Sequence, residues 1–304
     1  MDFKQFRYFI AVADALHMGR AAELLGVAQP ALSQQIKALE QRLRTQLFSR
    51  DNRRLTITAA GRLFLEEARI AVRQADHALQ MGMKAGRGEI GRIVIGYVDS
   101  AMLGSTLRTV LANFQNSRPE VEVGLIAMNV VDQINDLMEE KLDIAIVRGP
   151  LPLMPPFLSA DLFQREPMAV AIPEAHPLAS LQSLTLEQLR DEKFITPKDP
   201  VGIGLAGHIS RLCESVGFVP RVSIQVASTQ TMVALVAAGF GVSILPVSLD
   251  RVRIPGVTFR PFTQEVSTEL FTIRRARERR PDVLGFLKVC QMITHQRPDG
   301  NQDR

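Results

Sequence analysis

Apolar residues recur at helical spacing at the start of the chain. One such series predicts an amphipathic helix, because residues three and four apart share a helix face; its members are Phe3, Phe6, Phe9, Ile10, Ala13 and Leu16. A second, short helix is expected from Arg20 to Leu25, followed by Gly26, which suits the left-handed residue after a helix end. A third helix is expected to begin near Gln29 and Pro30, since proline fits the first helical turn.

The third helix has an apolar face and a polar face. Its apolar residues lie four, three and four positions apart: Leu32, Ile36, Leu39 and Leu43. At about 100° per residue, the opposite face collects Pro30, Ser33, Gln34, Lys37 and Gln41. Two helices, a glycine turn and a third helix with an exposed polar face are the layout of a helix-turn-helix.

The polar face carries side chains that suit the major groove of DNA. Gln bonds adenine through two hydrogen bonds, Ser bonds either way, and Lys reaches phosphate or guanine. The following segment, LFSRDNRRLTIT, is expected to form a tight Asp51-Asn52 turn between two extended segments, a wing. Its arginines would contact phosphates or the minor groove: Arg50, Arg53 and Arg54. A single polar helix face is more often only solvated, so the ordered combination carries this interpretation.

These residues also resemble a known family. "AAELLGVAQPALSQQIKALEQRL", followed by "LFSR" and "LTITAAG", resembles the DNA-binding module of LysR-type transcriptional regulators, without gaps from about residue 3 to 65. The resemblance implies which residues meet DNA: Gln29, Pro30, Ser33 and Gln34 in the groove, and Arg50 and Arg53 in the wing.

The chain departs from the family pattern at two helix starts. Ala28 stands where the family commonly has a serine N-cap, a loss usually worth about 1 kcal/mol, and Gln29 is a candidate replacement. The run from His17 to Gly19 replaces a serine-containing start of the second helix, so the phosphate contact expected there loses its usual donor.

A long helix is expected from Ala60 to about Arg87, a stretch without proline. At 1.5 Å per residue, about 27 residues span about 40 Å, more than packing within one small domain needs. We prefer an antiparallel dimerisation helix, which the resemblance implies, over a helix that lies on its own protomer; tetramers are implied by the resemblance alone. Small residues form a heptad seam along it: Phe64, Ala68, Ala71, Ala75, Ala78 and Gly82.

Beyond GRGEIG at 86–91, apolar strands alternate with helices, which argues for parallel α/β sheets. Two lobes of this kind resemble type-2 periplasmic binding proteins, the fold of the LysR effector domain. The expected fold is therefore α/β overall, with an N-terminal all-α winged helix-turn-helix, a linker helix and a two-lobed α/β domain. The expected boundaries are 1–60, 61–88 and 89–304, with lobe one at about 91–161 and 266–304 and lobe two at about 162–265.

A ligand of such a fold binds between the lobes, at strand C-termini and helix N-termini. Free N–H groups at Ser100 and Ala101 would attract a carboxylate, the expected effector class, and Arg148 can add a bidentate bond. Ser100 and Asn129 are equally suited to cap helices, and Arg148 to a surface ion pair. The expected effector-binding residues are Ser100, Ala101, Asn129, Arg148, Thr196 and Pro197.

Charge distribution supports a nucleic-acid partner for the first module. Residues 1–90 hold 14 Lys and Arg against 9 Asp and Glu, whereas the other residues hold 22 against 23. An excess of basic residues in one module suggests a nucleic-acid or anionic-surface partner. The resemblance to LysR-type regulators implies that this partner is double-stranded promoter DNA. The alternative is a sequence-nonspecific architectural DNA binder, for which phosphate contacts alone suffice.

Enzymatic chemistry finds little support in the sequence. The five histidines fall in no metal-ligand spacing, no serine stands in a G-x-S-x-G context, and GIGLAG at 202–207 lacks dinucleotide-fingerprint spacing. No cofactor, metal or catalytic residue is expected. Cys213 and Cys290 are expected to be inert buried thiols, and RRARERR at 274–280 a solvated turn. With no secretory pattern and no membrane span, a cytoplasmic location is expected.

Overall fold

The computed structural model describes residues 2–51 and 54–295, with only the backbone of residues 50, 51, 54 and 295. The chain forms two compact units, residues 1–84 and 85–304. None of the helices described in these ranges is long and apolar enough to cross a membrane.

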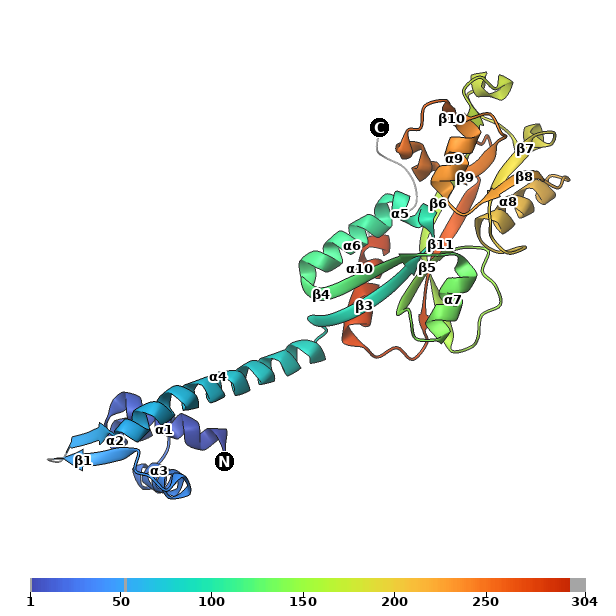
Figure 1. Cartoon of the computed structure of the whole chain (residues 1–304). Helices are drawn as coiled ribbons and strands as arrows, with labels where there is room; N and C mark the ends of the chain where they lie inside the picture. The colour runs from blue at the N-terminus through green and yellow to red at the C-terminus, as the bar shows by residue number, and fades with distance from the viewer. Residues whose placement is uncertain (1, 52–53, 296–304) are drawn as a thin grey trace. The chain divides into compact units, whose positions relative to one another are not determined.

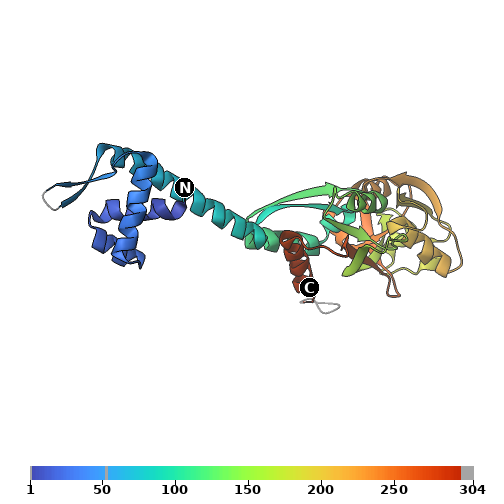
Figure 2. The same cartoon turned by 90° about the horizontal axis from the view of Figure 1, so that it is seen from below.

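Helices and one hairpin build the N-terminal unit (Figure 1), and Figure 2 shows the hairpin extending away from the helices. Its elements are α1 (Phe3–Ala15), α2 (Met18–Leu25), α3 (Gln29–Leu43), β1 (Phe48–Asp51), β2 (Arg54–Ile57) and α4 (Ala59–Gly86). The three predicted helices and the wing are confirmed, although α2 begins two residues before the predicted start. His17 explains this difference, because its side chain accepts a hydrogen bond from the Arg20 N–H and caps the helix.

The core of this unit is formed by the helix faces that the spacing of apolar residues predicted to be buried. Leu32, Ile36 and Leu39 of α3 are buried against Phe9 of α1. Gly26 adopts the predicted left-handed conformation, with φ of 62°, and ends α2.

The first half of α4 belongs to this core rather than to a free seam. The ring of Phe64 lies 5.0 Å from that of Phe9, and Ala68 is 1% exposed. Ion pairs of Arg7 with Asp76 and of Arg69 with Asp14 continue the contact along α1. The predicted seam is therefore wrong for Phe64 and Ala68, because the apolar edge of α1 already covers them.

A mixed sheet and a small parallel pair organise the C-terminal unit. The large sheet has the order β10-β6-β11-β5-β3-β4, with β9 also on β6. Its strands are β3 (Ile90–Tyr97), β4 (Glu120–Ala127), β5 (Ile144–Arg148), β6 (Leu158–Pro173), β9 (Ser243–Pro246), β10 (Val257–Pro261) and β11 (Ser267–Arg275), and the pair is β7 (Lys193–Pro197) with β8 (Arg221–Val226).

The sheet differs from the all-parallel arrangement that the alternating pattern predicted. Strand β3 is parallel to β4 and β5, but β11 is antiparallel to β5 and β6. The long strand β6 pairs with β11 up to Pro167 and with β9 and β10 from Met168 on. One strand thus passes continuously from lobe one into lobe two, and its partners change beyond Asp161, where we expected the crossing.

Helices cover each lobe (Figure 1). Lobe one carries α5 (Asp99–Leu103), α6 (Ser105–Ser117), α7 (Val130–Met138) and α10 (Pro281–His295), and lobe two carries α8 (Gly204–Ser215), α9 (Thr229–Ala237) and the 3-10 helices η1 (Pro177–Ser180), η2 (Leu186–Leu189) and η3 (Val247–Val252). Separate apolar cores, around Phe114 and Phe286 in lobe one and Phe194 in lobe two, make each lobe a packing unit.

The arginine-rich segment at 274–280 is not simply solvated. Arg275 and Arg280 both bind the carboxylate of Asp143, which is 5% exposed, at 3.1 and 2.6 Å. The expectation of a solvated turn is therefore wrong for these two residues, because a buried carboxylate needs cationic partners. Cys213 and Cys290 are buried as predicted, and burial raises the pKa of each thiol to about 12.

Candidate functional site

The polar face of α3 is open, opposite the face that packs into the core. Gln29, Pro30, Gln34 and Lys37 are exposed, and Ser33 is half-buried. Within residues 2–51 and 54–295, the side chains of Gln34 and Lys37 have no hydrogen-bond or ionic partner. The five side chains predicted to meet DNA therefore share one surface.

The starts of α2 and α3 meet at this surface. Gly19 lies between them, since a Cβ there would stand 3.1 Å from the His17 ring and 3.5 Å from Gln29 Oε1. Ala28 provides no cap for α3, and the described contacts hold no hydrogen bond from Gln29 in its place. The close approach puts the capping imidazole of His17 beside a side chain predicted to read bases.

The wing is a hairpin with a two-residue connection. Asp51 pairs with Arg54, and Ser49 Oγ lies 2.8 Å from Thr56 Oγ1 across the strands. The predicted contact residue Arg53 lies in the connection, outside the described residues. Arg50 and Arg54 lie in the strands, and only their backbone is described.

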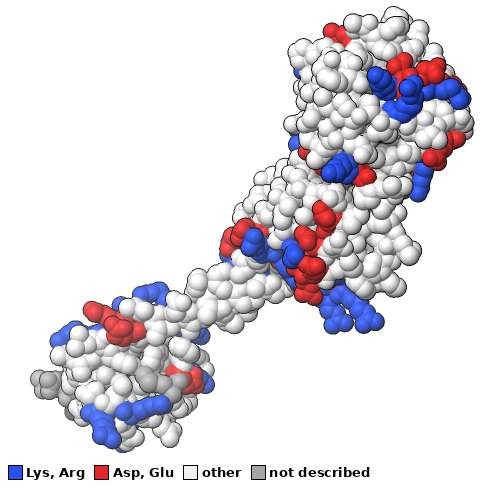
Figure 3. Space-filling model, turned by 45° about the vertical axis from the view of Figure 1, so that its right-hand side comes forward, with Lys and Arg blue, Asp and Glu red and all other residues white. Residues whose placement is uncertain are grey.

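The second half of α4 exposes apolar and uncharged residues. Leu79 and Met83 are 60% and 52% exposed. No charged residue occurs from residue 77 to 83, and most of this helix surface is white in Figure 3. Exposed apolar side chains on an uncharged helix surface suit contact with a partner helix better than contact with water.

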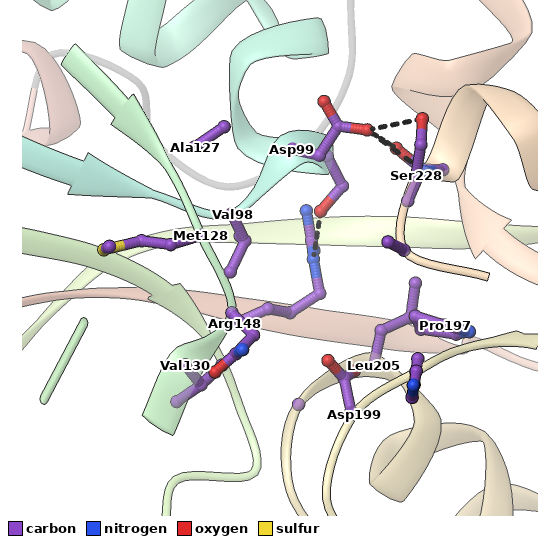
Figure 4. Close-up of a pocket in the computed structure, with 16 residues that line it drawn as sticks. Val98, Asp99, Ala127, Met128, Val130, Arg148, Pro197, Asp199, Leu205 and Ser228 are labelled. Atoms are coloured by element: carbon purple, nitrogen blue, oxygen red, sulfur yellow. Dashed lines mark hydrogen bonds between the residues drawn. The ribbon is translucent and has the colours of Figure 1, made fainter. Parts of the chain in front are cut away.

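A cavity of about 550 Å³ lies between the lobes of the C-terminal unit. Lobe one contributes residues 98–100, 127–130 and 148, and lobe two contributes 197–199, 204–205 and 227–229. In Figure 4, Pro197, Leu205 and Asp199 lie across the cavity from Val98 and Met128. Its volume suits a small organic ligand.

Four of the six predicted effector-binding residues line this cavity, namely Ser100, Asn129, Arg148 and Pro197. Ala101 and Thr196 are both 2% exposed and do not form part of its wall. The predicted effector-binding residues include none at the N-termini of α8 and α9, where residues 204–205 and 227–229 line the cavity. Ser228, which suits a helix N-cap, was the available signal for residues 227–229.

Arg148 is buried at the centre of lobe one's wall, with 1% exposure. Its Nη2 donates to Glu166 Oε2 at 3.1 Å, and its Nε to Ser100 Oγ at 3.2 Å, drawn as a dashed line in Figure 4. Nη1 is buried and has no hydrogen-bond partner in the described part of the chain. Burial lowers the pKa of Arg148, and Glu166 opposes that change. The pair is thus a buried one, not the surface ion pair considered above.

The side chain of Asn129 and the N–H group of Ala101 already make local hydrogen bonds. Asn129 accepts from the Asp132 N–H at 2.9 Å and donates to the Asp132 carboxylate at 2.6 Å, so it caps α7. The Ala101 N–H donates to the Val98 carbonyl at 2.8 Å. The expected free N–H group at Ala101 is therefore wrong, because the single-turn helix α5 uses it internally.

Two carboxylates also border the cavity, each at the start of a lobe-two helix. Asp99 Oδ2 accepts from Thr229 N at 3.0 Å, and Asp199 Oδ2 accepts from Ala206 N at 3.1 Å. Burial raises the pKa of Asp199, while the N–H groups of Ala206 and Leu205 oppose the rise. Within the described ranges, no group of three or more His, Cys, Asp or Glu residues is arranged to hold a metal ion.

Comparison with known proteins gives the same two parts. Residues 3–62 match the family described as "Bacterial regulatory helix-turn-helix protein, lysR family", and residues 86–292 match "LysR substrate binding domain". The chain is 38% identical to the HTH-type transcriptional regulator XapR of Escherichia coli (strain K12) over 288 residues, covering 94% of this chain and 96% of XapR.

Solved structures agree over nearly the whole length. The crystal structure of CbnR, a LysR family transcriptional regulator, superposes with a TM-score of 0.86 at 28% identity, covering 95% of this chain and all of that one. Full-length CbnR in complex with its target DNA gives a TM-score of 0.83 at 27% identity, covering 97% and 100%. The winged helix-turn-helix, the interlobe cavity and these matches together show that the chain belongs to the LysR family of transcriptional regulators.

Proposed function

We propose that α3 and the wing read promoter DNA through separate roles. Gln29, Ser33 and Gln34 contact base edges, Pro30 packs against the groove, and Lys37 reaches phosphate or guanine. The wing residues Arg50, Arg53 and Arg54 hold the sugar-phosphate backbone. The observation that carries this proposal is the open polar face of α3, opposite the buried Leu32, Ile36 and Leu39.

Two chains pair through α4 in this proposal. The exposed Leu79 and Met83, in a stretch without charges, support pairing in the second half of the helix rather than along the whole predicted seam. A dimer presents two recognition helices to a dyad-symmetric operator. Assembly of two dimers into a tetramer, acting on chromosomal DNA in the cytoplasm, completes the proposed regulator.

A small molecule in the interlobe cavity controls this regulator. The buried Arg148 supports an effector with an acceptor group, since Nη1 has no partner among the described residues and an unsatisfied buried donor costs free energy. A small carboxylate is the proposed class, because a carboxylate oxygen makes a charge-assisted bond to a guanidinium. The chain itself carries out no catalysis and needs no cofactor in this proposal.

Specific binding is tested by footprinting the DNA beside the protein's own gene, with excess unrelated duplex present. A discrete protected region with dyad symmetry is expected, and Gln34→Ala should lose discrimination between operator variants. Arg53→Ala should weaken binding to all duplexes alike and flatten its dependence on salt. If unrelated duplex removes the protection there, and a genome-wide binding map shows no discrete sites either, the architectural alternative is favoured.

Effector binding is tested by a panel of small carboxylates, with the unfolding temperature of the full chain as readout. A ligand that raises it in the wild type should fail with Arg148→Met, which keeps the stem but removes the guanidinium. A broad panel without any stabilising carboxylate would refute the proposed class. Lys198→Met is the matched control, since this exposed cation borders the same cavity.

A further inference from the structure

Asp99 is a carboxylate of lobe one that caps a helix of lobe two. Its Oδ2 accepts hydrogen bonds from Ser228 Oγ at 3.2 Å, Thr229 N at 3.0 Å and Thr229 Oγ1 at 2.9 Å. Ser228 occupies the N-cap position of α9, yet its side chain makes no capping bond within the helix. The cap that a serine usually supplies from its own helix therefore comes from the other lobe.

The position that Asp99 fills is one where a free anion binds readily. The first N–H groups of a helix point outward, and the helix dipole places partial positive charge there. Figure 4 shows the Asp99 carboxylate joined to Ser228 at the edge of the cavity. At the neighbouring helix α8, Asp199 fills the corresponding position from within lobe two. Both lobe-two helix starts at the cavity thus already hold a carboxylate of the protein.

Arg148 differs from the two helix starts of the same cavity, because one of its donors is not yet used. It is 1% exposed, and its Nη1 lacks a hydrogen-bond partner within the described residues. The cavity is also bordered by Lys198, whose side chain is exposed. An effector's acidic group therefore meets two helix starts that already hold a carboxylate and two cations, of which only the guanidinium of Arg148 is buried. Electrostatic attraction favours either cation, and the unsatisfied Nη1 donor favours the guanidinium.

We infer that Asp99 is a specificity-determining residue of the effector cavity. Its carboxylate acts as a built-in ligand of α9 and directs the acidic group of an effector to Arg148. The consequence for specificity rests on the proposed effector function, whereas the occupancy of α9 by Asp99 does not. Because Asp99 and α9 belong to different lobes, the same contact also joins the two lobes, beside the bond from Gly204 N to the Pro150 carbonyl at 2.9 Å.

Chemical rescue of Asp99→Ala in the full chain tests this inference. Loss of one helix cap should lower the unfolding temperature by about 2–4 °C in a unit of this size. Acetate or formate, which carry the deleted carboxylate, should restore that loss by occupying the vacated helix start. Asp99→Asn should lose less and should not respond, because its amide oxygen still accepts from the Thr229 N–H and fills the position.

Asp161→Ala is the matched control, since Asp161 is a half-exposed carboxylate that pairs only at the surface, with Arg274 at 3.5 Å. Acetate should change its unfolding temperature no more than it changes that of the wild type. By calorimetry, Asp99→Ala should also bind succinate, a short dicarboxylate, more tightly than the wild type does.

The outcomes separate this inference from the proposed effector class. An Asp99→Ala protein with native circular dichroism that acetate does not stabilise beyond the control would overturn the built-in ligand. Rescue without any carboxylate binding to the wild type would support the role of Asp99 and refute the proposed effector class. Carboxylate binding to the wild type without rescue of Asp99→Ala would support the proposed effector class and overturn the role of Asp99.

Discussion

Glu166→Ala offers the strongest test of how the buried Arg148 is held. The substitution removes the carboxylate that lies 3.1 Å from Nη2 and leaves the guanidinium with the Ser100 hydroxyl alone. Both partners are almost fully buried, with side-chain exposures of 1% and 6%. Water therefore cannot replace the lost partner unless the lobe opens.

The magnitude follows from this burial. Removing one partner of a buried ion pair costs about 3–5 kcal/mol, because the other charge remains without compensation. In a unit of about 220 residues, each kcal/mol lowers the unfolding temperature by about 2–4 °C, so a fall of about 6–20 °C is expected. Replacing both charges, as Arg148→Met with Glu166→Leu, should recover most of the loss, since an apolar pair of similar volume is often neutral.

Urea unfolding of the full chain, followed by circular dichroism, measures these free energies by linear extrapolation. Glu269→Ala is the control, since Glu269 pairs with Arg165 at 2.7 Å on the surface and should cost at most about 1 kcal/mol. A Glu166→Ala protein that loses no more than this control would refute the reasoning. So would a double variant no more stable than Glu166→Ala.

Three further expectations come from other parts of the chain. Gly61→Ala should destabilise the N-terminal unit by about 1–3 kcal/mol, because a Cβ would lie 2.2 Å from the Leu47 carbonyl oxygen; a variant as stable as the wild type in urea would contradict this. Burial lowers the pKa of His208, so below the unfolded value of 6.5 the unfolded chain takes up a proton that the folded chain does not, and stability falls. His208→Gln should weaken that fall between pH 7 and 5 in urea titrations, and an unchanged pH dependence would count against it. Leu79→Glu together with Met83→Glu should shift the protein to monomers in light scattering while its circular dichroism spectrum stays native, and a persistent dimer would contradict the proposed pairing.

The sequence predicted the DNA-binding face of α3 better than it predicted the effector cavity. The polar face of α3 follows from local periodicity, so Gln34 and Lys37 could be placed on it without any long-range information. The cavity forms only where the two lobes meet, so local periodicity cannot predict it. The sequence still identified Ser100, Arg148 and Pro197 as lining residues, from their places at the ends of strands and the starts of helices. It misplaced Ala101, whose N–H is used within the short helix α5.

The sequence by itself determined the helix-turn-helix, since helix faces, Gly26 and the proline at the start of α3 are local features that short-range physics fixes. Tertiary structure alone decided three matters that depend on distant partners. Phe64 packs into the core of its own unit because α1 covers it. Arg148 of β5 pairs with Glu166 of β6, across the intervening strand β11, and Asp99 accepts from Thr229, which is 130 residues away in the sequence. Periodicity reports which face of an element is apolar, but not what will cover it, and a carboxylate's partner is set only when lobes close.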